Sequence, residues 1–117
     1  MLQVVKYRPG GAFSPNLDFY EDAQKDDDYN LGNRVAQAMI FLSDVKLGGG
    51  FAMPDLGIYV PPKAGTLVVW HNVDKNGEND KLSLHGGCPV WSGNKVAAIT
   101  SYHALNQKQW TCRENLR

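Results

Sequence analysis

Short apolar runs separated by turn-forming residues are the main pattern along the chain. Apolar residues gather in Leu2–Tyr7, Arg34–Ser43, Gly57–Val60, Thr66–Asn72 and Val96–His103, with Gly, Pro, Asp and Asn between them. Short apolar runs separated by such turn-forming residues are typical of strands. With the two further strands described next, the pattern predicts about seven strands and an all-β sandwich or barrel.

Two further segments complete the predicted strands, Ala12–Tyr20 and Lys81–His85. Side chains alternate between the two faces of a strand. In the first segment, this alternation puts Phe13, Pro15, Leu17 and Phe19 on one face, and Ser14, Asn16, Asp18 and Tyr20 on the other. Asn16 and Asp18 are then two residues apart on one face, so both side chains can point at the same site.

The segments between the strands are polar. Glu21–Asn33 is acidic and has no periodicity, which indicates a surface loop or a lid over a neighbouring site. Arg34–Ser43 fits a helix about as well as a strand, and its flanking turn signals favour a buried central strand. Asp74–Asp80 is a turn-rich loop, and Ala104–Arg117 receives no assignment.

Length and charge limit the function classes. The 117 residues suit one domain, with 12 basic and 12 acidic residues and a net charge of zero. Nucleic-acid-binding and anionic-membrane-binding proteins usually have an excess of basic residues, which this chain lacks, so its charge does not indicate either partner. The apolar runs are far shorter than the ~20 residues of a membrane span. A strand directly after Met1 does not resemble a secretory signal, so we expect either a cytoplasmic protein or a fragment of a longer chain.

Chemistry-bearing residues gather in the second half of the chain. His85 precedes Gly86 and Gly87, which would let the backbone approach another group closely, and Lys95 follows at the start of an apolar strand. By spacing alone the signal is weak, because a histidine before two glycines is more often a turn residue than a ligand. Cys88 and Cys112 are either reduced thiols or a disulfide that closes a loop of about 25 residues, worth roughly 3 kcal/mol.

Three segments carry a resemblance to a known family. They are Val5–Phe19, Phe41–Val45 with Gly48-Gly49, and His85–Val90 ahead of Gly93-Asn94-Lys95, and Trp70 and Asn72 add to them. Together they resemble the catalytic domain of collagen-type prolyl 4-hydroxylases, which are Fe(II)/2-oxoglutarate dioxygenases. The resemblance spans nearly the whole chain. It implies that residues 1–117 form a mainly β jelly roll, the double-stranded β-helix. Because catalytic domains of that family carry additional elements, it also favours a fragment of a larger catalytic domain.

The resemblance also implies a metal site and a cosubstrate site. In that family two histidines and one carboxylate hold Fe(II) on one face and leave the other positions open. Asp18 would be the carboxylate and His85 the distal histidine, whereas Asn16 occupies the position of the first histidine. Lys95 would pair with the far carboxylate of 2-oxoglutarate, and Tyr7 would donate a hydrogen bond near it. Ascorbate is the further cofactor of this family.

Several departures from the family pattern lie around the same site. Asn16 replaces an imidazole ligand by a weaker neutral amide. Gln37 stands for a threonine, Val96 for a tryptophan and Ser101 for an aromatic residue, and Gly50-Phe51 replaces an acid and a threonine. Two hypotheses follow. One is a peptidyl-proline hydroxylase, and the alternative is a weak or inactive paralogue that binds proline-rich peptides or a subunit.

The remaining expectations also come from the resemblance. His71 is a poor candidate to replace the missing ligand, and His103 matches a structural histidine. Cys88 and Cys112 match family cysteines that pair, which implies an oxidising compartment such as the endoplasmic reticulum. Proline-containing or collagen-like chains are the expected substrates, and a protein disulfide isomerase subunit is a possible partner.

Overall fold

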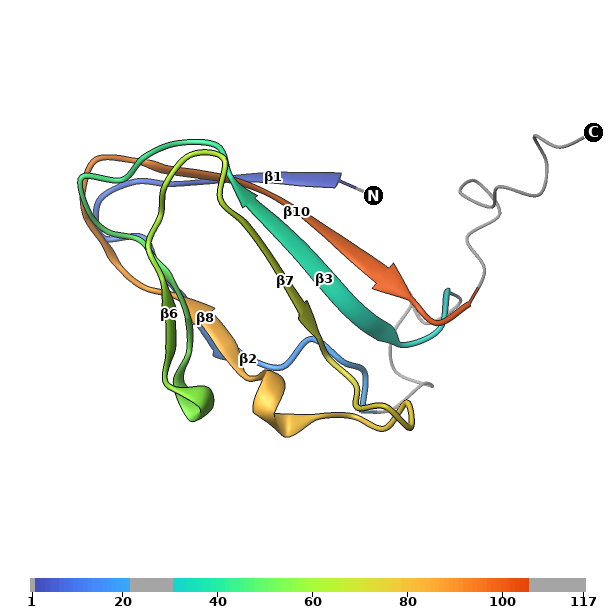
Figure 1. The fold of residues 1–117 in the computed structure, drawn as a ribbon. Coiled ribbons are helices and arrows are strands. Elements are labelled where there is room, and N and C mark those ends of the chain that lie inside the picture. The colour runs from blue at the N-terminus through green and yellow to red at the C-terminus, as the bar shows by residue number, and fades with distance from the viewer. Residues whose placement is uncertain (1, 22–30, 106–117) are drawn as a thin grey trace, which may run out of the picture.

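The computed structural model describes residues 2–21 and 31–105, which form two facing antiparallel sheets (Figure 1). The large sheet has the order β1 (Leu2–Tyr7), β10 (Lys95–His103), β3 (Arg34–Phe41) and β7 (Leu67–His71). The small sheet has the order β2 (Phe13–Asn16), β8 (His85–Gly87), β5 (Phe51–Met53) and β6 (Ile58–Val60). A separate pair joins β4 (Leu47–Gly48) and β9 (Val90–Ser92). Because the chain passes back and forth between the two sheets, the predicted jelly roll is confirmed.

The large sheet unites the two ends of the described chain. β1 pairs with β10 from Leu2 opposite Thr100 to Tyr7 opposite Lys95. In Figure 1 these first and last strands run side by side. β3 lies between β10 and β7, as its apolar sequence predicted for a central strand. This register brings Tyr7 and Lys95 together although 87 residues separate them in the sequence.

The core fills the space between the sheets. Its buried side chains are those of Met39, Phe41, Phe51, Met53, Trp70 and Ala97, with Val5, Val60, Val68 and Ile99 packed against them. Burying one large apolar side chain stabilises a fold by roughly 1.5–3 kcal/mol. This cluster therefore holds the sheets together and leaves the space beside it for a cavity.

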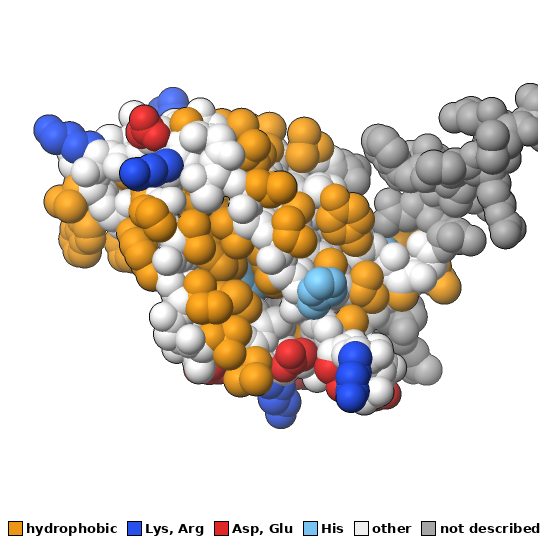
Figure 2. Space-filling view, in the orientation of Figure 1, with side chains coloured by type: hydrophobic (Ala, Val, Ile, Leu, Met, Phe, Trp, Pro, Cys, Tyr) orange, Lys and Arg blue, Asp and Glu red, His pale blue; other side chains and the backbone are white. Residues whose placement is uncertain are grey.

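The outer face of the large sheet is also apolar. Leu2 and Val4 on β1 are 67% and 62% exposed, and Leu67 and Val69 on β7 are 60% and 57% exposed. Figure 2 shows hydrophobic side chains over much of the face in view. An antiparallel sheet that meets water on one side normally alternates apolar and polar residues, so apolar residues on both faces are typical of a sheet covered on both sides.

Two short 3-10 helices interrupt the strands, η2 (Pro54–Leu56) and η3 (Lys81–Ser83). The prediction of a strand over Lys81–His85 was therefore wrong. The Asp80 carboxylate accepts a hydrogen bond from the Leu82 N–H at 2.9 Å and caps the turn. No helix in the described ranges is long and apolar enough to cross a membrane.

The other differences concern short strands. β2 ends at Asn16, four residues before the end of the predicted strand at Tyr20, and its pairing with β8 is irregular between Phe13 and Asn16. β4, β5 and β9 were not predicted, and each has only two or three residues. A period of two residues is invisible in segments this short.

Candidate metal and cosubstrate site

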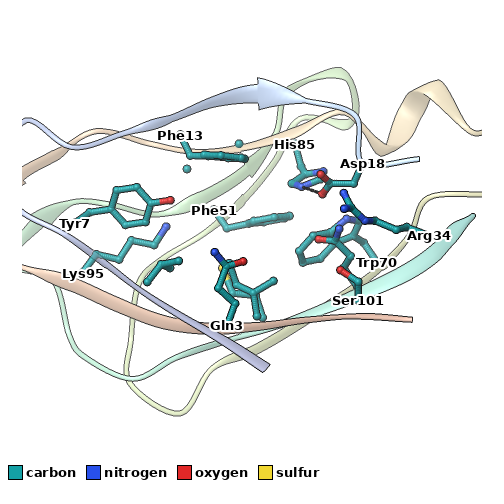
Figure 3. Close-up of a pocket in the computed structure, with 16 residues that line it drawn as sticks. Gln3, Tyr7, Phe13, Asp18, Arg34, Phe51, Trp70, His85, Lys95 and Ser101 are labelled. Carbon is teal, nitrogen blue, oxygen red and sulfur yellow. Dashed lines mark ion pairs between the residues drawn. The ribbon is translucent and has the colours of Figure 1, made fainter. Parts of the chain in front are cut away.

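A cavity of about 240 Å³ opens between the two sheets beside the core. Its lining residues include Tyr7, Phe13, Asp18, Arg34, Gln37, Phe51, Trp70, His85, Gly87, Lys95 and Ser101. Small-molecule sites are concave clefts of roughly 300–1,000 Å³, so this cavity suits a small ligand. Figure 3 shows Tyr7 and Lys95 at one end, Asp18, His85, Arg34 and Ser101 at the other, and Phe51 between them.

Asp18 and His85 face each other in this cavity. The His85 Nε2 lies 2.9 Å from the Asp18 Oδ2, and the two side chains are 6% and 18% exposed, respectively. The other ring nitrogen, Nδ1, lies 2.8 Å from the Ser83 carbonyl oxygen, which can only accept a hydrogen bond. Nδ1 therefore carries a proton, and the Nε2 lone pair is directed at a carboxylate. Two Lewis bases in contact require a cation between or on them, either a proton or a divalent metal.

Aromatic rings hold the His85 imidazole in place. The Trp70 ring centroid lies 4.6 Å from the imidazole centroid, and that of Phe51 lies at 5.6 Å. The backbone approach is equally close: a Cβ on Gly86 would lie 2.8 Å from the Phe13 carbonyl oxygen, so only glycine lets β2 pair here. This contact accounts for Gly86, and β2 then carries the chain directly to Asp18.

Lys95 forms the positive end of the cavity. Only 4% of the residue is exposed, and its Nζ lies 5.5 Å from the Tyr7 ring centroid and 5.3 Å from that of Phe41. Burial lowers the pKa of Lys95, because the ammonium loses water, and the nearby Cys88 acts in the opposite direction. No carboxylate in the described part of the chain forms an ion pair with Lys95. A buried cation without a partner fits an anionic ligand.

Asn16 lies near Asp18 and His85, but its side chain does not line the cavity as theirs do. Its Cα lies opposite that of His85 in the β2–β8 register. Its side-chain amide Nδ2 donates to the Ser14 carbonyl oxygen at 3.1 Å, and the residue is not among those that line the cavity. Within residues 2–21 and 31–105, no group of three His, Cys, Asp or Glu side chains is arranged to hold a metal. The described chain thus offers two strong ligands to a cation.

The other histidines lie elsewhere. His71 is exposed on β7. His103 Nδ1 lies 3.0 Å from the Gly32 carbonyl oxygen, and its ring lies 6.5 Å from the Tyr20 ring. Cys88 is half-buried near Lys95, while Cys112 lies outside the described residues, so the disulfide remains a prediction.

The sequence analysis did not identify Arg34, nor the two asparagines, Asn33 and Asn79, that hold the backbone at Tyr20. The Arg34 guanidinium carbon lies 4.7 Å from the Tyr20 ring centroid, at the edge of the cavity. A charged residue at the start of an apolar strand was the available signal. Asn33 and Asn79 were invisible, because they meet only in the folded chain.

An asparagine clamp, formed by Asn33 and Asn79, holds the backbone beyond Asp18. The Asn33 Oδ1 accepts from the Tyr20 N–H at 2.8 Å, and the Asn79 Nδ2 donates to the Tyr20 carbonyl oxygen at 3.2 Å. The Asn33 Nδ2 donates to the Asn79 Oδ1 at 2.7 Å and closes the ring of contacts. Since β2 ends at Asn16, this clamp fixes the segment that carries Asp18 where strand pairing has stopped.

We expect Asn79→Ala to weaken divalent-metal binding at Asp18 and His85 by about tenfold, the lower end of the effect of removing outer-shell support. The fold should lose only about 1 kcal/mol, because Asn79 is exposed. A Mn(II) titration followed by calorimetry measures the first effect and urea unfolding the second. Asn76→Ala, in the same loop, is the control. Equal metal affinity in all three proteins would show that the clamp does not position Asp18.

Known proteins that are similar in sequence or structure point to the same family as the cavity residues. Residues 2–103 match the profile described as the 2OG-Fe(II) oxygenase superfamily. The chain is 38% identical to the human prolyl 4-hydroxylase subunit alpha-1 over 112 residues, which cover 92% of this chain and 20% of that protein. A crystal structure of a viral collagen prolyl hydroxylase from Paramecium bursaria Chlorella virus-1, in complex with 2OG, has 30% identity and a TM-score of 0.78, covering 90% of this chain and 59% of that one. A Pseudomonas putida prolyl-4-hydroxylase, at 21% identity and a TM-score of 0.62, shares the fold.

Proposed function

Because the chain belongs to the 2OG-Fe(II) oxygenase superfamily, we propose that it is the jelly-roll part of a dioxygenase that hydroxylates peptidyl proline. The chain spans about a fifth of the length of the curated relatives that it matches, so the activity of the whole protein belongs to this proposal. The observation that carries it is the arrangement of one cavity. A pair of metal-binding side chains lies at one end, and a buried, unpaired lysine lies at the other.

Asp18 and His85 fit a divalent cation. The Ser83 carbonyl fixes the tautomer of His85, and the lone pair and the carboxylate already converge on one point. Fe(II) and 2-oxoglutarate, which the family implies, would supply the oxidising chemistry. The residues of the chain would bind and orient: Asp18 and His85 hold the metal, and Lys95 and Tyr7 take the far carboxylate of the oxoacid.

The apolar walls assist by excluding water. Phe51 and Trp70 are 3% and 6% exposed and line the cavity between its two ends. In such a dry site the attraction between Lys95 and a carboxylate is stronger than at the surface. An oxoacid anchored there would present its other end towards the metal pair, which is the orientation that the reaction needs.

A second function has one specific observation in its favour. The first ligand position holds Asn16, and no three-ligand group is present in the described part of the chain. A protein with a weakened metal site would bind a proline-rich peptide or a partner subunit without hydroxylating it. Ascorbate as cofactor, a disulfide isomerase subunit and residence in the endoplasmic reticulum belong to the first function and come from the family.

Anaerobic calorimetry with Fe(II), with and without 2-oxoglutarate, tests the proposal on the 117-residue chain. We expect micromolar binding that 2-oxoglutarate strengthens. Asp18→Ala and His85→Ala should each weaken it by at least about a hundredfold, because removing a direct ligand costs more than removing its support. His71→Ala is the matched control. Absence of binding in the unaltered chain would rule out the dioxygenase and leave the binding module.

A further inference from the structure

Gln37 is a buried polar residue that the site described so far does not use. It lies in the middle of β3, is 5% exposed and lines the cavity. Its side-chain amide makes no hydrogen bond to any residue in the described part of the chain. It is also not among the polar atoms that the fold seals from solvent, so its amide opens into the cavity.

The next inward-facing residues on β3 are apolar, so a glutamine at position 37 is unusual. Met39 and Phe41 point inward from the same strand and belong to the apolar core. Because the Gln37 amide opens into the cavity, water or a ligand can hydrogen-bond to it, whereas no group of the described fold does. An apolar residue would suit the fold better at this position, so the glutamine has a use outside folding.

Gln37 and its neighbours add uncharged polar groups to the end of the cavity that also holds Asp18, His85 and Arg34. On β10 its cross-strand partner is Ser101, and on β7 it is Trp70, and all three line the cavity. Ser101 lies six residues beyond Lys95 on β10, roughly 20 Å along the strand. Figure 3 shows Ser101 beside Arg34 and Trp70, at the opposite end from Lys95. Gln37 and Ser101 are therefore well separated from the Lys95 ammonium.

This separation indicates what each end binds. A carboxylate is attracted to Lys95, whereas an amide and a hydroxyl offer both donors and acceptors without charge. A peptide bond is the neutral group that matches them, through its carbonyl oxygen and, outside proline, its N–H. The X–Pro bond keeps only the carbonyl, which the Gln37 Nε2 can still bind as a donor.

We propose that Gln37, together with Ser101, binds a backbone amide of the peptide substrate and so determines how the peptide lies across Asp18 and His85. This inference rests on the proposed function, since the peptide is its substrate. Gln37 would then act on peptide affinity alone. Binding of the metal and of the oxoacid would not depend on it.

The test uses the 117-residue chain with Mn(II) and 2-oxoglutarate, and a fluorescein-labelled Pro-Pro-Gly repeat peptide as the probe. Fluorescence anisotropy should show peptide affinity reduced roughly threefold to tenfold in Gln37→Leu, the effect of one lost hydrogen bond. Calorimetry should show 2-oxoglutarate affinity unchanged. Thermal unfolding of the ligand-free protein should show a Tm that is not lowered, because the amide makes no hydrogen bond within the described fold. Asn76→Leu, at an exposed loop position that does not line the cavity, is the control and should change none of these.

Each other result overturns the inference. Equal peptide affinity in Gln37→Leu and the unaltered chain would exclude a contact with the peptide. A loss of 2-oxoglutarate affinity would assign Gln37 to the oxoacid, and a lower Tm would assign it to folding. If the unaltered chain binds metal and 2-oxoglutarate but no peptide, the peptide substrate itself is wrong, which separates that failure from a failure of Gln37.

Discussion

Replacing Lys95 by methionine should weaken 2-oxoglutarate binding at least thirtyfold and stabilise the ligand-free protein. Removing one partner of a buried charge pair costs about 2–5 kcal/mol, and methionine keeps most of the volume of the lysine stem. The gain in stability follows because the buried ammonium is unpaired without ligand. Calorimetry with 2-oxoglutarate and thermal unfolding measure the two effects. Lys63→Met, at an exposed position, is the control.

The pH dependence of this substitution has a definite sign. Burial lowers the pKa of Lys95, so the unfolded chain binds more protons than the folded chain between the folded and the ordinary value. The unfolding free energy therefore carries a penalty at lower pH that is relieved as pH rises through the folded pKa of Lys95. Lys95→Met keeps Tyr7 and Cys88, so any difference between the two pH profiles belongs to Lys95 and its interaction with Cys88. Identical profiles would contradict its role as the buried cation.

Asn16→His should raise divalent-metal affinity by at least about tenfold. The register places residue 16 opposite His85, and directly opposite side chains in an antiparallel pair have Cβ atoms about 4.5–5.5 Å apart. An imidazole is also a stronger ligand for Fe(II) than an amide. Mn(II) calorimetry measures the affinity, and hydroxylation of a proline peptide under Fe(II) and 2-oxoglutarate measures the gain in turnover.

Two further variants make this experiment specific. Asn76→His adds an imidazole at an exposed loop position and should leave metal affinity unchanged. Asn16→Ala should lower the affinity less than Asp18→Ala does, because the Asn16 amide already donates to Ser14 and is neutral. A histidine at position 16 that brings no gain would locate the defect in the rest of the cavity, where Gln37, Val96 and Ser101 also depart from the family pattern.

Much of the large sheet could be predicted from the sequence. The strand predicted over Arg34–Ser43 is β3 at Arg34–Phe41, and that over Thr66–Asn72 is β7 at Leu67–His71. Both strands are long enough for their apolar residues to form a recognisable pattern. Lys81–His85 was wrong because a local cap from the Asp80 side chain decided its conformation. Such a contact competes with strand formation without changing the hydrophobic pattern.

The candidate site was predictable in its residue types and not in its geometry. Asp18, His85, Lys95 and Tyr7 were chosen through a family resemblance, and all four line one cavity. The orientation of Asn16 depends on a hydrogen bond to its own neighbour and on an irregular strand pairing. The clamp of Asn33 and Asn79 joins residues 46 positions apart. Contacts of this kind arise from the fold and leave no local signal.

The pairing of β1 with β10 has a consequence for the order in which the protein is made. Leu2–Tyr7 leaves the ribosome well before its partner strand, which begins at Lys95. Until then β1 has no neighbour, and neither Tyr7 nor any other residue of β1 can meet Lys95. The end of the cavity that Tyr7 and Lys95 form is therefore completed only after Asp18 and His85 have emerged. A chain rich in such distant pairings folds slowly, on the scale of roughly milliseconds to seconds. A nascent chain that stops before β10 lacks the Lys95 end of the cavity.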